Sequence, residues 1–158
     1  MEELSFPLGR SFAIVAKKYF GVLTKLLENL AVERYYSILI LIDKSERPCT
    51  QHYICEQLRI DKVSMVRMID YLIKKEMVHK VLNEKDRREY FIKLTPTAFQ
   101  LMPEIYNAVS SVNEAALKGI SAEQQKMLYK NIDQIKQNLE SLPSETVYIN
   151  YKKAGKKI

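Results

Sequence analysis

The spacing of the apolar residues changes once along this chain, over residues 77–94, and that change limits the folds open to it. On both sides of this segment the apolar residues recur every three or four positions, which is the repeat of amphipathic helices. From Tyr90 to Leu94 every second residue is apolar and Lys93 lies between two of them, as in a strand with one buried face. Val78 to Leu82 is the expected partner strand. We therefore predict a β-hairpin set between helical segments.

The remainder of the chain is expected to be mostly helical, because four glycines and five prolines in 158 residues provide few loops. Thr50, Asp61 and Thr95 each precede a predicted helix and can cap its first turn through a side-chain oxygen. The predicted helices span Phe6–Leu30, Glu33–Asp43, Thr50–Leu58, Asp61–Glu76, Pro96–Lys118 and a last segment with Leu128, Ile132, Ile135 and Leu139 on one face. The fold class is therefore mainly α with a small β-hairpin.

The charge of the chain suits a polyanionic partner. The formal net charge is +6, and residues 47–94 contain eleven Lys and Arg against seven Asp and Glu. Four further lysines, Lys152, Lys153, Lys156 and Lys157, lie near the C-terminal end of the sequence. The longest aliphatic run, Ile38 to Ile42, is too short to span a bilayer, and the N-terminal residues show no secretory signal. We expect a cytoplasmic protein with no membrane partner.

Two short helices joined by a tight turn precede the hairpin, and this order is typical of a helix–turn–helix. The first helix would end at Leu58, the turn would be Arg59-Ile60, and the second helix would begin after Asp61. We expect the second helix to bury most of its apolar side chains, namely Val63, Val66, Ile69, Leu72 and Ile73. The side chains expected to face outward, and thus to reach base edges and phosphates, are Lys62, Ser64 and Arg67.

A hairpin directly after such a helix is a wing, and this one has a charged tip. Six of the seven residues from Asn83 to Glu89 are charged, including Lys85, Asp86, Arg87 and Arg88. A guanidinium fits a narrow minor groove, where the negative potential is enhanced, and a carboxylate nearby can hold it in one orientation. The pattern therefore predicts a wing tip that contacts DNA.

Residues 50–95 resemble the winged-helix regulators of the multiple antibiotic resistance regulator (MarR) family. Three segments carry the resemblance: "IDKVSMVRMIDYLIKKEMV" from Ile60, "DRR" from Asp86 and "IKLTP" from Ile92. In these places the family has a helix rich in Ser and Thr with Arg and Asp, an Asp-x-Arg pair in the wing, and the junction between wing and next helix. Arg67 and Asp70 fall on the helix positions, and Asp86 and Arg88 fall on the wing pair.

The resemblance implies a dimeric transcription regulator, a repressor of palindromic double-stranded DNA sites, without a cofactor. The whole chain would be one domain, with residues 31–95 as the DNA-binding region, residues 1–30 and 96–142 as dimerisation helices, and residues 143–158 as a basic tail. The family often holds a small aromatic effector between the dimerisation helices and the DNA-binding region. Binding of the effector would release DNA. The side chains that could line that site are Tyr19, Tyr35, Tyr36 and Tyr106. The residues expected to contact DNA are Thr50, Gln51, Lys62, Ser64, Arg67, Lys85, Asp86, Arg87 and Arg88.

The sequence departs from the family pattern in places. Glu76 stands where the family usually has glycine before the first wing strand, so a different turn is expected there. Val63 stands where the family often has serine, and Tyr71 stands where it often has a basic residue. After the wing, Thr97-Ala98 replaces the acidic or basic residue and glycine that commonly end the family signature. These differences bear on base preference more than on the fold.

Other interpretations of the same residues stay open at this stage. The charged tip could be a solvated turn, Arg67 could pair with Asp70 or Glu76 on the surface, and the wing could bind a protein. A thiol-based redox sensor would use Cys49 or Cys55; we expect Cys55 to be buried and Cys49 to be more exposed. The two histidines, at positions 52 and 79, lack the spacing of metal ligands, and no catalytic or phosphate-binding motif is present. We therefore expect neither a metal site nor an enzyme.

Overall fold

The computed structural model describes residues 7–30, 32, 35–84 and 86–145. Its helices and strands follow the predicted order, with one extra short strand. The elements are α1 (Leu8–Leu26), α2 (Tyr36–Lys44), β1 (Cys49–Thr50), α3 (Gln51–Leu58), α4 (Lys62–Lys74), β2 (Val78–Leu82), β3 (Tyr90–Leu94), α5 (Pro96–Ala116) and α6 (Ala122–Glu140). The basic cluster at residues 152–157 lies outside the described residues.

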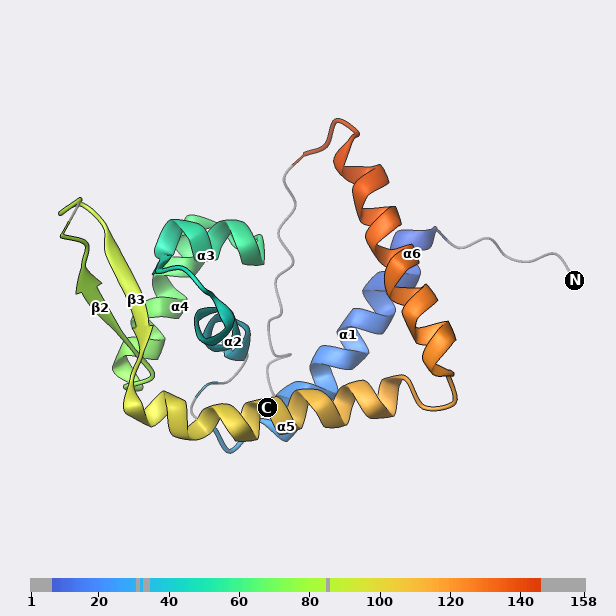
Figure 1. Ribbon diagram of the computed structural model, residues 1–158, viewed down its shortest axis with the longest axis horizontal. Coiled ribbons are helices and arrows are strands. Elements are labelled where there is room, and N and C mark those ends of the chain that lie inside the picture. Colours follow the sequence, from blue (N-terminus) through green and yellow to red (C-terminus); the bar gives the residue numbers. More distant parts are fainter. Residues whose placement is uncertain (1–6, 31, 33–34, 85, 146–158) are drawn as a thin grey trace, which may run out of the picture.

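Two groups of elements are visible in Figure 1. The hairpin β2–β3 lies with α2, α3 and α4 at one end of the molecule, while α1 and α6 lie at the other end. Helix α5 runs from the base of the hairpin toward α6 and packs against α1, α2 and β3. The charged tip of the hairpin is therefore far from the outer helices, at the opposite end of the structure. Among the residues that the structure describes, none of the helices combines the length and the apolar composition of a membrane span.

The predicted hairpin is confirmed, and it belongs to a three-stranded antiparallel sheet in the order β1-β3-β2. Val78 pairs with Leu94 at its base and Leu82 pairs with Tyr90 near its tip. The third strand, β1, pairs Cys49 with Ile92 and has only two residues. A strand of this length has no detectable repeat, which is why the sequence did not predict it.

The three predicted N-caps form as expected. Thr50 Oγ1 accepts the Tyr53 amide at 3.1 Å, Asp61 Oδ1 accepts the Ser64 amide at 2.8 Å, and Thr95 Oγ1 accepts the Ala98 amide at 3.1 Å. Each bond satisfies one of the amides that have no partner within the helix. The starts of α3, α4 and α5 are thus set by local chemistry, and α3 and α4 are separated by the short turn that a helix–turn–helix requires. Arg59 closes α3 in the left-handed conformation, with φ of 51°.

The core lies between α2, α3, α4, the sheet, α5 and the C-terminal end of α1. Its composition corrects the prediction for α4. Met65, Ile69 and Leu72 are fully buried, whereas Val63 is 63% exposed and Val66 is 40% exposed. Ile73 is half-buried. Met65 was not predicted as a core residue. It takes the place expected for the valines, because the buried face of α4 is rotated away from them.

Helices α1 and α6 expose most of their apolar side chains within the subunit. Helix α1 ends at Leu26 rather than at Leu30, and α2 begins at Tyr36 rather than at Glu33, a residue outside the described set. In α1 and the residue that follows it, Leu23 and Leu27 are buried, whereas Phe12, Val15 and Leu26 are exposed. None of the 19 residues of α6 is buried.

The turn between α4 and β2 keeps the backbone conformation that glycine adopts most easily. Glu76 has a positive φ of 57°, although it carries a Cβ atom. The Met77 amide donates to the carbonyl oxygen of Leu72 at 2.8 Å, and the Thr95 hydroxyl donates to the carbonyl oxygen of Glu76. The expectation of a different turn was therefore wrong: the conformation is left-handed, and the hydrogen bonds around it stabilise glutamate there.

Candidate nucleic-acid interface

One face of α4 is open to solvent along its length. Its residues recur at intervals of three and four, which places them in a single stripe on the side opposite Met65 and Leu72. The members of this stripe are Val63, Val66, Arg67, Asp70 and Lys74. A helix of 13 residues that buries one face and leaves the other free has the form needed to enter a major groove.

Arg67 lies in this stripe as predicted and is exposed. The proposed surface salt bridge of Arg67 with Asp70 or Glu76 is not formed, since the described residues offer Arg67 no ion pair within 4.0 Å. Asp70 instead lies 3.8 Å from the ammonium of Lys80, on the first strand of the wing. The Arg67 guanidinium is thus available for a ligand, whereas Asp70 connects α4 with β2. Lys62 is exposed as predicted, and Ser64 is half-buried near the Asp61 cap.

The wing tip contains an ordered ion pair. Arg88 Nε donates to Asp86 Oδ1 at 3.0 Å, and Arg88 Nη2 donates to Asp86 Oδ2 at 2.9 Å. The Arg88 amide also donates to Asp86 Oδ1, at 3.0 Å. These hydrogen bonds lower the pKa of Asp86 below its ordinary value, so the carboxylate stays charged at neutral pH. The predicted pairing of an aspartate with a nearby guanidinium in the wing is therefore present.

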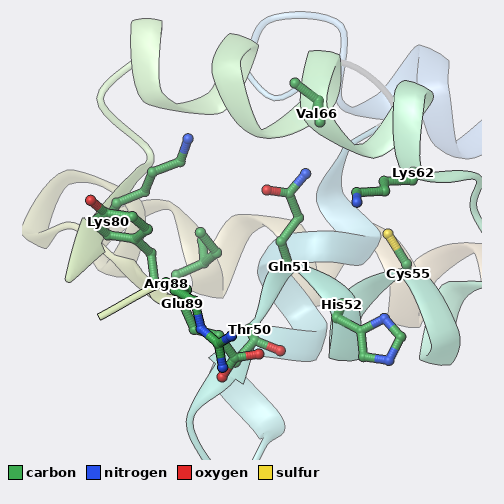
Figure 2. A pocket seen from close by; sticks show the side chains of 11 residues that line it. Thr50, Gln51, His52, Cys55, Lys62, Val66, Lys80, Arg88 and Glu89 are labelled. Atoms are coloured by element: carbon green, nitrogen blue, oxygen red, sulfur yellow. The ribbon is translucent and has the colours of Figure 1, made fainter. Parts of the chain in front are cut away.

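A pocket of about 420 Å³ lies between α3, α4 and the wing. Figure 2 shows Lys62 and Val66 on the side of α4, Lys80, Arg88 and Glu89 on the side of the wing, and Gln51 projecting between them. Two lysines and an arginine in one concave surface favour an anionic ligand, and a strand of nucleic acid presents such charges in a row. The pocket is lined by Thr50, Gln51, His52, Cys55, Lys62, Val66, Lys80, Arg88, Glu89, Tyr90 and Ile92.

The structure brings together four of the predicted DNA-contacting residues, Thr50, Gln51, Lys62 and Arg88, around this pocket. Arg67 lies one residue beyond Val66 on the same helix, and Arg87 is exposed at the wing tip. Lys85 lies outside the described residues. All these assignments to DNA contact stay predictions.

Sequence reasoning missed His52, Lys80 and Tyr90 as members of the same surface. His52 follows the predicted contacts Thr50 and Gln51 by two positions and one position, so it could have been included from the helix start. Lys80 could have been found from the strand repeat, because it lies in the middle of β2 and pairs with Ile92 across the sheet. Tyr90 gave no signal beyond its strand position.

The four tyrosines suggested for an effector site have structural contacts in this subunit. Tyr19 donates to Asn113 Oδ1 at 2.7 Å, and Tyr35 packs edge-to-face on Tyr71 with ring centroids 5.0 Å apart. Tyr36 is buried, and the Tyr106 hydroxyl donates to the carboxylate of Asp43. None of the four lines the pocket of Figure 2. An effector site made by these residues stays a prediction.

The two cysteines are placed opposite to expectation. Cys49 is buried in strand β1, whereas Cys55 is half-buried and lines the pocket. The short strand that buries Cys49 was not predicted, which explains the error. Burial raises the pKa of the Cys55 thiol, and the charge of Asp61 adds to this effect. A raised pKa disfavours the thiolate that a redox sensor requires.

Comparison with known proteins agrees with this geometry. A sequence model of the MarR family matches residues 32–89. A protein described as a MarR family transcriptional regulator from Listeria monocytogenes, solved in complex with 26mer DNA, has 20% identity and a TM-score of 0.77 over 85% of this chain and 89% of its own. A MarR transcriptional regulator from Methanosarcina mazei has 20% identity and a TM-score of 0.76 over 85% and 98% of the two chains.

A third similar structure is a cysteine-to-serine mutant of MarR from E. coli, complexed with operator DNA. It has 23% identity and a TM-score of 0.75 over 82% of this chain and 94% of its own. These three structures share the fold well beyond the matched segment. Together with the family match, they confirm the resemblance inferred from the helix, wing and junction segments. Over residues 32–89 this chain is similar in sequence to the MarR family, and its described residues share the fold of these MarR regulators.

Proposed function

We propose that this protein is a transcription regulator that binds double-stranded DNA through α4 and the wing. The observation that carries this proposal is the shared pocket: Lys62 at the start of α4 and Arg88 at the wing tip border the same concave surface. An α4 seated in a major groove therefore brings the wing to the adjacent backbone or minor groove of the same duplex. Two of the similar structures, from Listeria monocytogenes and E. coli, were solved with DNA bound.

Helix α4 and the wing would have different roles in DNA binding, because their exposed side chains differ. Arg67, exposed on α4 and without an ion pair among the described residues, can grip a guanine through O6 and N7. Lys62, Lys80 and the wing arginines meet phosphates, which supply affinity without sequence preference. Asp86 holds Arg88 in one orientation, so the guanidinium reaches the DNA already ordered.

We also propose that two copies of the chain act together as a homodimer. Helix α6 has Leu128, Ile132 and Leu139 exposed along one face, with Ile135 half-buried between them. Such a stripe at the spacing of a packed helix needs a partner surface, and the described residues of the subunit leave much of it uncovered. A second copy provides the same stripe, and α1 adds Phe12 and Val15.

A dimer explains how one short recognition helix per subunit can be enough to bind a specific DNA site. Two α4 helices placed roughly 34–36 Å apart would read the two halves of a palindrome one helical turn apart. Occupation of such a site blocks other proteins from the same DNA, and on this basis we assign the role of repressor. Release by a small aromatic effector stays a prediction.

Selection of bound sequences from a random pool of duplexes tests the proposal. The purified protein should enrich one palindromic sequence with half-sites about 10 base pairs apart. Arg67→Ala should change the preferred base at one position of each half-site, whereas Arg88→Ala should weaken binding to every sequence alike. Recovery of the unselected pool at low salt, with no enriched motif, would refute the proposal.

A further inference from the structure

Two valines on the exposed face of α4 are left partly uncovered by the described residues of the subunit. Val63 is 63% exposed and Val66 is 40% exposed, whereas Met65 and Ile69 on the same helix are fully buried. Val63 and Val66 are three residues apart and therefore lie on neighbouring turns of one stripe. Val66 also lines the pocket that Lys62 and Arg88 border.

Exposed valines on this helix have a cost that the fold does not offset. Valine is a poorer helix former than alanine, because its branched side chain loses rotamer freedom in a helix. Their methyl groups are exposed to solvent between two cationic side chains, Lys62 and Arg67. An apolar pair inside a cationic surface indicates a partner that is itself apolar at two points and anionic around them.

The major groove of DNA has that character. Its base edges present hydrogen-bond donors and acceptors, and the C5-methyl group of thymine is its one apolar feature. Phosphates flank the groove on both sides, where Lys62 and the wing arginines would meet them. In a helix lying along the groove, side chains three residues apart contact neighbouring bases.

We propose that Val63 and Val66 determine base preference by contacting the C5-methyl groups of thymines in each half-site. This inference rests on the proposed DNA-binding function and adds a reading mechanism to it. Arg67 reads a base through hydrogen bonds, while the valines read neighbouring bases through apolar contact. The half-site preferred by this protein is then set by one polar and two apolar contacts from the same stripe of α4.

Replacement of single thymines by deoxyuridine tests this mechanism, because it removes only the methyl group. The probe is the palindromic duplex enriched from the random pool, and affinity is measured by fluorescence anisotropy for the full-length protein. One deoxyuridine position per half-site should depend on Val63 and another on Val66. Each should weaken wild-type binding about fourfold per half-site, the value of one buried methyl group, and thus about sixteenfold for the palindrome.

The valine variants identify the contact. In Val63→Ala one of the two deoxyuridine effects should disappear while the other persists, and Val66→Ala should show the reverse. Arg67→Ala serves as the matched control on the same stripe: it should lower affinity but keep both deoxyuridine effects. Because the two valines are exposed and alanine is the better helix former, both alanine variants should melt at the wild-type temperature or slightly above it and keep the oligomeric state of the wild type.

The outcomes separate this inference from the proposed function. If no duplex is enriched, DNA binding itself fails, and the valine contacts fail with it. If a palindrome is bound but its half-sites lack thymine under α4, the valine contacts alone are refuted. The same conclusion follows if deoxyuridine has no effect, or if its effect is unchanged in both alanine variants.

Discussion

Asp86 holds Arg88 at two points, with Nε–Oδ1 and Nη2–Oδ2 distances of 3.0 and 2.9 Å. The Arg88 side chain is nevertheless 90% exposed, so the ion pair is screened by water. Exposed pairs of this kind contribute little to stability, with a median of about 0–1 kcal/mol. The value of the pair therefore lies in orientation: it keeps a long cationic side chain in one position at the edge of the pocket that α4 also borders.

Asp86→Asn should weaken DNA binding, although it removes a negative charge from a surface that meets an anion. Loss of the two-point pair frees the Arg88 side chain, which must then be ordered again on DNA in each of the two subunits. The expected result is an affinity about tenfold lower or more, with a melting temperature close to that of the wild type. Fluorescence anisotropy and thermal unfolding measure the two quantities.

Glu84→Gln is the matched control, because it removes one negative charge from the same exposed wing without touching the pair. Long-range electrostatics alone would make both variants bind more tightly. Tighter binding by Asp86→Asn, equal to that of Glu84→Gln, would show that orientation of Arg88 has no role.

Glu76→Gly should stabilise the protein. Glu76 has φ of 57°, a conformation that costs a residue with a Cβ atom about 1–2 kcal/mol, while the added chain entropy of glycine costs about 0.5–1 kcal/mol. The free energy of unfolding from urea titration should therefore rise by about 0.5–1 kcal/mol. Lys75→Gly is the control, since Lys75 has an ordinary φ of −89° and glycine there should destabilise. An equal decrease in the free energy of unfolding in both variants would contradict backbone strain at Glu76.

Leu128→Asp should convert the protein to a monomer. Leu128 lies on the uncovered stripe of α6, and a carboxylate there would be buried without a partner in the dimer interface. Light scattering coupled to size exclusion should show half the wild-type mass, and affinity for a palindromic duplex should fall steeply with it. Gln137→Asp adds the same charge on the opposite side of α6 and should leave the mass unchanged. A wild-type mass for both variants would exclude α6 from the interface.

Tyr106→Phe should change the stability of the protein at high pH. Burial, together with the hydrogen bond to Asp43, raises the pKa of Tyr106 to about 12. A raised folded-state pKa gives stability that is complete below the unfolded value of 10.0 and is lost as the pH rises toward 12. Wild type should therefore lose more stability than Tyr106→Phe between pH 10 and 12, in urea titrations at each pH. If the free energies of unfolding of the two proteins change in parallel between pH 10 and 12, the raised pKa of Tyr106 is refuted.

The elements that sequence predicted best are those set by local chemistry. Thr50, Asp61 and Thr95 cap their helices as expected, and the strand repeat placed both long strands, because capping and alternation depend on neighbouring residues alone. The wing pair of Asp86 and Arg88 was also predicted, since two residues so close in sequence meet without help from the rest of the fold.

The errors arose where tertiary packing chose between local alternatives. Helix α4 carries apolar residues on more than one side, so its pattern alone could not place Val63 outside and Met65 inside. Cys49 is buried by a strand too short to predict. The pocket formed by α3, α4 and the wing is likewise absent from any local pattern, because its residues come from segments far apart in the chain.

The salt dependence of affinity for the enriched duplex tests the central claim most directly, namely that α4 and the wing contact one DNA duplex together. Four phosphate contacts per subunit, from Lys62, Lys80, Arg87 and Arg88, predict that log K falls against log salt with a slope of about −7 for the dimer. Arg88→Ala should reduce the size of this slope by about 2, because it removes one contact in each subunit. A slope near zero, or a slope that Arg88→Ala leaves unchanged, would contradict the account.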